Sequence, residues 1–351
     1  MRIKSIDLRV VYNSFGKKTI EAVINSKFRA SSPSGTSKSE FEAREIEPEI
    51  AIRRFNKIKG LFIGNFTQRK FDELLQRYIN EIGTAATTAL SLAFFSSRKM
   101  REKRVPYLIG NVMGGGKHSF GLSRQKIQEI LVITRSKSIR KQMEISSEIW
   151  HEVRKALMKR KALLGLNHEF AWLHKLRDEE ALKVAREIAS SFNVRLGIDV
   201  AADHFSGYRR EKQVEFIKKL ITKFELYYVE DPFRSDDFKS FGKLTHEFGS
   251  SCLICGDDLI ASRLERLKIA LRYNAVNAVI VKPNQVGTIT ACLDLMKMAR
   301  ENKIEPVVSH RSQETCCAVL AKLAVLAKYA KISVCGIDIE KRNELLRLLE
   351  G

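Results

Sequence analysis

Charged residues recur at the ends of short apolar segments in the second half of the chain. In chain order they are Asp199, Glu230, Asp257, Lys282, His310 and Arg311. Successive members are separated by roughly 25 to 31 residues, about the length of one strand–helix unit. Polar residues at the carboxyl ends of neighbouring barrel strands meet at one mouth of the barrel. Three acids, a lysine and a His-Arg pair therefore predict a cation site, a base and an anion-binding pair.

Lys282 directly follows the continuous apolar segment 278–281. Such a segment predicts a strand that is buried on both faces of a parallel sheet. A lysine at the end of that strand has little water to solvate its ammonium group, and nearby cations also disfavour the charge. Both effects lower the pKa of the amine. The pattern therefore predicts that Lys282 is a general base near neutral pH.

The first hundred residues predict a small α+β domain. Strand patterns, a Ser/Gly/Pro-rich loop and helical patterns follow one another over residues 3–12, 19–25, 31–39, 46–58, 70–82 and 85–100. We expect residues 1–104 to form an N-terminal capping domain in which loop 31–39 is mobile.

Residues 105–351 predict an α/β barrel. Strands are expected near residues 109 and 130, a helical region over 136–164, and alternating strands and helices from residue 194 to the C-terminus. The last strand is expected at 331–335, before a helix at 338–349. This alternation is typical of parallel βαβ units. The predicted fold is an eight-stranded α/β barrel that follows a small α+β cap.

Composition narrows the class of protein. The 351 residues are 44% hydrophobic and 29% charged, which is typical of an ordered soluble protein. No apolar run approaches the length of a membrane-spanning helix or a secretory leader, so we expect a cytoplasmic protein without a membrane partner. Six cysteines in a chain of this length do not indicate a disulfide framework. Cys252 and Cys255 are interpreted as small core residues on opposite faces of a strand.

The chain is strongly basic, with 62 Lys and Arg against 41 Asp and Glu, a net charge of +21. That charge would attract phosphorylated metabolites and also nucleic acid. Basic clusters lie at 98–104, 135–141 and 154–161, without regular aromatic residues between them. They are interpreted as solvated helical faces, so nucleic-acid binding is possible but not favoured.

Eight short motifs, taken together and in their order along the chain, resemble the enolase family. They are Pro33–Ser37, Asn111–His118, Gln128–Glu129, Gly197–Ala202, Val229–Phe233, Gly256–Leu259, Val281–Thr288 and Val308–Thr315. The resemblance extends over almost the whole chain. It implies an enolase-type eight-stranded α/β barrel with an N-terminal cap. It also implies a phosphopyruvate hydratase, the lyase of glycolysis and gluconeogenesis that converts 2-phosphoglycerate to phosphoenolpyruvate.

The resemblance implies two Mg²⁺ ions per active site. Asp199, Glu230 and Asp257 would hold the first ion through oxygen ligands, which suit a hard cation. Ser37, in the loop of the first domain, would help to bind the second ion when substrate arrives. Homologous enzymes commonly pair through the first domain, so a homodimer or higher homo-oligomer is expected.

The resemblance also implies the catalytic residues. Lys282 would remove the C2 proton, and two divalent ions would stabilise the enediolate. Glu169 would act as general acid on the C3 hydroxyl with the support of Glu129, and His118 would line the same site. The remaining histidines are interpreted as ordinary residues: His151, His168, His174, His204 and His246.

Substrate binding is where the chain departs from the family. Arg311 and Ser312, with His310 beside them, would bind the phosphate. The family ends its last strand with a lysine that contacts the substrate carboxylate, and Ser333 stands there in this chain. Lys331 lies two residues earlier on the same strand face and is expected to substitute one layer lower.

Two further departures concern loops. Phe170 and Ala171 follow Glu169 where the family has glycines, and the turn at 13–18 lacks the family's Arg and Asn-Pro.

Three functions therefore remain open. The leading one is enolase activity. The second is a diverged enolase-superfamily enzyme that acts on a different carboxylate, and the third is a non-catalytic, basic nucleic-acid-binding paralogue.

Overall fold

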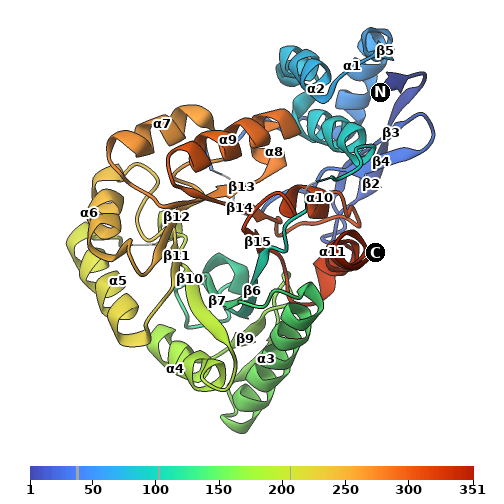
Figure 1. Ribbon diagram of the computed structural model, residues 1–351. Coiled ribbons are helices and arrows are strands. Elements are labelled where there is room, and N and C mark those ends of the chain that lie inside the picture. The colour runs from blue at the N-terminus through green and yellow to red at the C-terminus, as the bar shows by residue number, and fades with distance from the viewer. Residues whose placement is uncertain (37–38, 102, 206) are drawn as a thin grey trace.

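The computed structural model describes residues 1–36, 39–101, 103–205 and 207–351. Its N-terminal elements are β1 (Arg2–Ile3), β2 (Ile6–Tyr12), β3 (Lys18–Ile24), β4 (Phe28–Ser31), α1 (Pro48–Ile58), the 3-10 helix η1 (Lys59–Phe62), β5 (Gly64–Asn65) and α2 (Gln68–Ser96). Strands β2, β3 and β4 form an antiparallel meander, and α1 and α2 pack beside it (Figure 1).

Helix α2 joins the two helical segments that the sequence predicts at 70–82 and 85–100, and it ends at Ser96 rather than at residue 100. Gly83 separates them with non-helical backbone angles, φ 78° and ψ 160°. A side chain at this glycine would meet Ile46 at 2.9 Å, so both the positive φ and the close approach require glycine. Residues on both sides of the kink contact α9: Asp72 Oδ2 accepts from Thr290 N (2.8 Å), and Ser91 Oγ accepts from Ile289 N (2.9 Å).

Eight strands close into a barrel. They are β6 (Tyr107–Gly114), β7 (Glu129–Thr134), β10 (Val194–Asp199), β11 (Tyr228–Glu230), β12 (Leu253–Gly256), β13 (Ala278–Val281), β14 (Glu305–Ser309) and β15 (Tyr329–Lys331). Each strand pairs with the next, and β15 pairs with β6 to complete the ring (Figure 1). The predicted eight-stranded barrel is confirmed.

Strand β7 departs from the parallel arrangement of the other barrel strands, because it runs antiparallel to both β6 and β10. The segment between β6 and β7 contains only the 3-10 helix η2 (Gly116–Ser119). A parallel return needs a longer crossover, usually a helix, so the chain returns as a wide hairpin. A small hairpin of β8 (Leu163–Leu166) and β9 (Trp172–His174), which the sequence did not predict, joins the barrel along β6.

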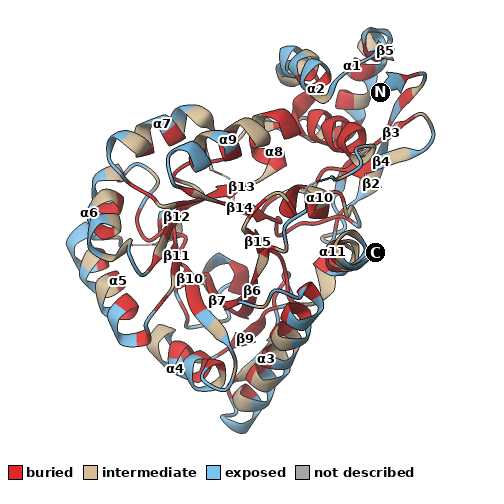
Figure 2. Cartoon of the chain, in the orientation of Figure 1, coloured by how far each residue is buried: buried red, intermediate tan, exposed pale blue. Residues whose placement is uncertain are grey.

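Helices surround the barrel. They are α3 (Ile139–Lys159), α4 (Asp178–Ala189), η3 (Ala202–His204), α5 (Arg210–Phe224), α6 (Phe238–Phe248), α7 (Leu264–Arg272), α8 (Pro283–Val286), α9 (Ile289–Glu301), α10 (Leu320–Ala324), η4 (Gly336–Asp338) and α11 (Ile339–Glu350). Their inward faces and the barrel strands are buried (Figure 2). No helix in the described part of the chain is long and apolar enough to cross a bilayer. The domain boundary at residues 104 and 105 stays a prediction.

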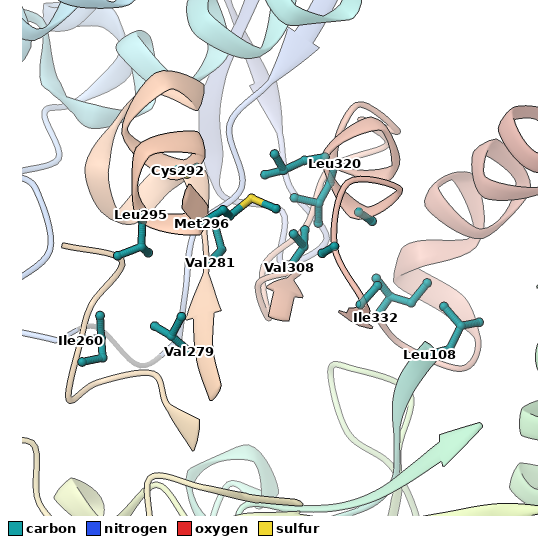
Figure 3. Close-up of a cluster of buried hydrophobic side chains, with 14 of the residues drawn as sticks. Leu108, Ile260, Val279, Val281, Cys292, Leu295, Met296, Val308, Leu320 and Ile332 are labelled. Atoms are coloured by element: carbon teal, nitrogen blue, oxygen red, sulfur yellow. The ribbon is translucent and has the colours of Figure 1, made fainter. Parts of the chain in front are cut away.

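Two apolar layers hold the barrel together. Residues such as Ile280 and Tyr329 fill its interior, and a larger layer lies between the strands and the outer helices. Figure 3 shows part of that outer layer, where Val281 of β13 faces Met296 of α9. Cys255 belongs to the inner layer and Cys252 to the outer one, as the sequence predicts. All six cysteines are free thiols.

The last strand ends earlier than predicted. β15 covers Tyr329–Lys331, whereas the sequence indicates 331–335. Its register pairs Lys331 with Ser309 of β14 and with Ile109 of β6. Lys331 is therefore the last residue of the strand, and Ser333 lies beyond it.

Gln142 of α3 is a buried side chain that ties this helix to the barrel. Its Oε1 accepts hydrogen bonds from Leu108 N (2.8 Å) and Thr134 Oγ1 (2.6 Å). Its Nε2 donates to the carbonyls of Pro106 (3.0 Å) and Ser136 (2.8 Å). The side chain thus satisfies polar groups at the start of β6 and at the end of β7.

We expect Gln142→Leu to lower the free energy of unfolding by about 2–4 kcal/mol, because buried backbone groups lose their partners. Denaturant unfolding measures the change. Lys141→Leu, on the exposed side of the same helix, serves as the matched control and should change stability by about 0.5 kcal/mol or less. Equal losses in the two variants would contradict the structural role of Gln142.

Candidate active site

A pocket opens at the carboxyl ends of the barrel strands, where the cap meets the barrel. It is lined by almost all the residues that the sequence analysis predicts to be functional, and both the predicted cap and the predicted barrel contribute to the lining. Its lining includes His118, Glu129, Glu169, Asp199, Asp257, Lys282, His310, Arg311, Ser312 and Lys331. Glu230 is fully buried and contacts Lys331, one of these lining residues. Ser37 lies outside the described residues; Gly35, two residues before it in the chain, lines the pocket.

The Lys331 ammonium lies among three buried carboxylates. Its Nζ is 2.9 Å from Glu129 Oε2, 3.1 Å from Asp199 Oδ2 and 2.9 Å from Glu230 Oε1. Burial opposes the charge on Lys331, but the three acids outweigh it and raise its pKa well above the usual value. Burial raises the pKa of Glu129 and of Glu230 to about 7 despite the lysine. The predicted contact of Lys331 with substrate stays a prediction.

Lys282 faces Asp257, and their charged groups are in direct contact. Gln285 Nε2 donates to the other oxygen of Asp257 (3.1 Å). The Asp231 carboxylate accepts hydrogen bonds from the backbone N–H groups of Asp257 (3.0 Å) and Asp258 (2.7 Å). Asp231 therefore holds the end of β12 so that Asp257 points at the lysine.

The expectation that Lys282 has a lowered pKa is wrong for this arrangement. Burial does act to lower the pKa, but the contact with Asp257 outweighs it, and the pKa of Lys282 is raised. Lys282 reciprocally holds the pKa of Asp257 below its usual value, against the effect of burial. The apolar context of Lys282 was visible in the sequence, whereas the distance to Asp257 was not.

Glu169 lies on a loop that is pinned by Asn167. The Asn167 side-chain oxygen accepts hydrogen bonds from the backbone N–H groups of Glu169 and Ala171, both at 2.9 Å. Glu169 Oε2 is 3.3 Å from His118 Nδ1 and accepts a hydrogen bond from Asn111 Nδ2 (3.3 Å). Burial opposes ionisation of Glu169, but His118 outweighs it and holds the pKa of Glu169 well below its usual value. The carboxylate is thus ionised in this arrangement.

His168, interpreted from the sequence as an ordinary residue, lies beside His118. The two rings are 4.5 Å apart between centroids, and the ring of Phe120 is 5.4 Å from that of His168. Ligand atoms of His118, His168 and Glu169 lie within 4.8 Å of one another. Burial lowers the pKa of His168 to about 4, so this imidazole is neutral near pH 7.

Arg311, predicted to bind phosphate, is held by Glu42 from the cap. Its Nη1 donates to Glu42 Oε2 (3.1 Å) and its Nη2 to Glu42 Oε1 (3.0 Å). Ser312 Oγ accepts from Thr36 N (2.8 Å), so cap residues cover both predicted phosphate ligands. Sequence reasoning missed Glu42, because no pattern around it distinguishes it from other surface acids.

The His310 side chain faces Asp338 of the 3-10 helix η4, which follows the last barrel strand. Its Nδ1 is 2.6 Å from Asp338 Oδ2, and Lys341 Nζ is 2.9 Å from the other oxygen of Asp338. Burial opposes the charge on His310, but Asp338 outweighs it and raises the pKa of the imidazole. Ser333 N also donates to Asp338 (2.7 Å), so the residue in the family's lysine position is engaged in backbone structure.

The predicted divalent-ion ligands fit a hard cation by their chemistry, because all three supply carboxylate oxygens. Two of them, Asp199 and Glu230, contact Lys331, and Asp257 contacts Lys282. A second acidic group, Asp231, Asp257 and Asp258, brings its oxygens within 4.8 Å of one another. Asp257 belongs to both sets. An ion that binds here must share its ligands with two ammonium groups.

Comparison with known proteins gives one consistent result. Residues 206–351 match the family model of the enolase C-terminal TIM barrel domain. The chain is 32% identical to an enolase of Natronomonas pharaonis, over 99% of this chain and 98% of the relative. It is 32% identical to an enolase of Archaeoglobus fulgidus (100% and 98%) and 33% identical to one of Methanocorpusculum labreanum (99% and 99%).

The Glu42–Arg311 pair predicts a measurable effect on anion binding. Glu42→Gln should increase the affinity for inorganic phosphate about 5- to 10-fold, because the guanidinium loses a carboxylate that an anion must otherwise displace. Isothermal titration calorimetry measures the affinity. Glu40→Gln, which changes an exposed acid two residues earlier, should leave it unchanged. An affinity that stays the same or falls in Glu42→Gln would show that Glu42 does not occupy the anion position.

Proposed function

The chain belongs to the enolase family, and on that premise we propose that it dehydrates 2-phosphoglycerate to phosphoenolpyruvate. The observation that carries the proposal is the pairing of Lys282 with Asp257 in a pocket that also contains Glu169, Asp199 and Arg311. A buried amine, several carboxylates and a guanidinium are the groups that proton abstraction next to a carboxylate requires.

In the proposed reaction Arg311 and Ser312 bind the substrate phosphate, and the Glu42 carboxylate withdraws from the guanidinium. The pocket then encloses the substrate between cap and barrel, which excludes water from the reacting carbon. His310 lies beside this pair, but its Nδ1 is engaged with Asp338. Its role is therefore to support the phosphate-binding segment.

Lys282 takes the C2 proton in this proposal, so its ammonium group, which Asp257 stabilises, must first release a proton to solvent. The charges of Arg311 and Lys331 already act to lower its pKa. One Mg²⁺ held by Asp199, Glu230 and Asp257, and a second that arrives with substrate near Ser37, would supply the positive charge that stabilises the enediolate.

Glu169 then protonates the C3 hydroxyl group, which leaves as water while the C2–C3 double bond forms. Glu169 is ionised before substrate binds, so it needs a proton from a neighbour. His118, at 3.3 Å, can supply it from its Nδ1. Glu129 lies 3.7 Å from the same nitrogen and supports this exchange. The net change moves one hydrogen and one hydroxyl from substrate to water.

A second candidate function is enolisation of a different carboxylate. It is favoured by the end of β15, where Ser333 bonds to Asp338 and Lys331 lies among the acids. Without an ammonium at position 333, the carboxylate of 2-phosphoglycerate loses one expected partner. This candidate predicts retained metal binding without turnover of 2-phosphoglycerate.

Binding of nucleic acid is the third candidate, carried by the net charge of +21. It predicts salt-sensitive association that is indifferent to substitution of Asp199 or Glu230.

A homo-oligomer also stays a proposal. Arg9 and Glu21, which resemble contacts between subunits in the family, pair with each other within this chain.

Lys282→Ala should lower the rate of phosphoenolpyruvate formation by about 100- to 10,000-fold, the range for loss of a general base. The assay follows ultraviolet absorbance from 2-phosphoglycerate with and without Mg²⁺. Lys297→Ala, an exposed lysine on α9, is the matched control and should retain full activity. No Mg²⁺-dependent product from the unaltered protein would refute the proposed reaction, and unchanged activity in Lys282→Ala would refute the role of Lys282.

A further inference from the structure

The cation that lies among Glu129, Asp199 and Glu230 is the side-chain ammonium group of Lys331. Lys331 ends strand β15, and the three acids come from β7, β10 and β11. The distances of 2.9–3.1 Å are ordinary for an ammonium hydrogen-bonded to carboxylates. The exposed fraction of each of the four side chains is 6% or less, so water screens these contacts weakly.

Asp199 and Glu230 are also held by donors other than the lysine. Asp199 Oδ1 accepts from Ala201 N (3.1 Å), and its Oδ2 accepts from Gln128 Nε2 (3.4 Å). Tyr228 Oη donates to Glu230 Oε2 (2.6 Å). Asp199 Oδ2 and Glu230 Oε1 still face the Lys331 nitrogen. Two of the three acids are therefore preorganised, and together with Glu129 they form a cradle for one cation.

We propose that the Lys331 ammonium is the resident cation of this cradle, so that a divalent ion gains Asp199 and Glu230 only by displacing it. Divalent metal–oxygen bonds are about 2.0–2.6 Å long, so an ion bound to these two oxygens would overlap the ammonium position. The inference rests on the proposed function only in taking Asp199 and Glu230 as metal ligands.

Two consequences separate this arrangement from an ordinary metal site. The cradle is neutralised in part without any metal, so the folded chain does not depend on a bound ion. Divalent ions bind more weakly than the number of carboxylates would suggest, because the free energy of the displaced ion pairs is subtracted from the binding free energy. Lys331 thereby sets the concentration of divalent ion that the site requires.

The test compares binding of Mn²⁺ to the unaltered protein and to Lys331→Gln by electron paramagnetic resonance titration, without substrate. Lys331→Gln should bind Mn²⁺ at least about 10-fold more tightly, which corresponds to about 1.4 kcal/mol. Its melting temperature should fall without metal, because three buried acids lose their cation, and should recover when Mn²⁺ is added. The unaltered protein should show a smaller rise in melting temperature.

Two controls separate competition from general loss of charge. Lys331→Arg keeps the charge and should not bind Mn²⁺ more tightly than the unaltered protein. Lys328→Gln removes a half-exposed lysine three residues earlier, which pairs with Glu305, and should leave Mn²⁺ affinity unchanged.

A milder variant covers the case in which Lys331→Gln does not fold. Glu129→Gln removes one acid that holds Lys331 but is not a predicted metal ligand, so it should also increase Mn²⁺ affinity. Unchanged or weaker Mn²⁺ binding in Lys331→Gln, or in Glu129→Gln when the first variant is unfolded, would overturn the proposal. Turnover of 2-phosphoglycerate is measured separately, so failure of the proposed reaction leaves this test intact.

Discussion

Burial of carboxylates at the mouth of the barrel is the constraint on which the site depends. An ionised acid removed from water is unstable unless a cation or several donors lie against it. Lys331 supplies the cation for Glu129, Asp199 and Glu230, and Lys282 supplies it for Asp257. The two lysines stand at the ends of β15 and β13, so closure of the barrel is what brings cations and acids together.

A buried ion pair also links the cap to the barrel. Arg311 is as deeply buried as the acids, and its partner Glu42 comes from the segment between β4 and α1. Thr36 contacts Ser312 a short distance away, and the backbone of Ser34 pairs with that of Gln313. The predicted anion site is therefore covered by cap residues whose polar groups would be replaced by those of a bound anion.

Local anchors set the finer geometry. Asp231 fixes the backbone of Asp257 and Asp258, and Asn167 fixes the turn that carries Glu169. At Phe170, where the family has glycine, the backbone adopts φ 62°, and the ring packs against Gly336. The absence of a side chain at Gly336 leaves the space that the Phe170 ring occupies.

The sequence by itself determined the eight-stranded barrel and many of the residues that line the pocket. Apolar runs that end in Asp199, Glu230, Asp257 and Lys282 recur at the length of a strand–helix unit, and periodicity of this kind is encoded locally. The two helical patterns that make up α2 were visible for the same reason, whereas their joining into one kinked helix at Gly83 was not predicted.

Only the tertiary structure decided the direction of β7, the partner of Arg311 and the protonation of Lys282. Each depends on residues distant in the chain: the short connection before Glu129, the position of Glu42 and the contact with Asp257. Lys331 is the clearest case. Its place on the strand face was predictable from the sequence. The convergence of three acids on its nitrogen follows from the pairing of β15 with β6, which closes the barrel. Local sequence patterns do not indicate which side chains meet across a closed barrel.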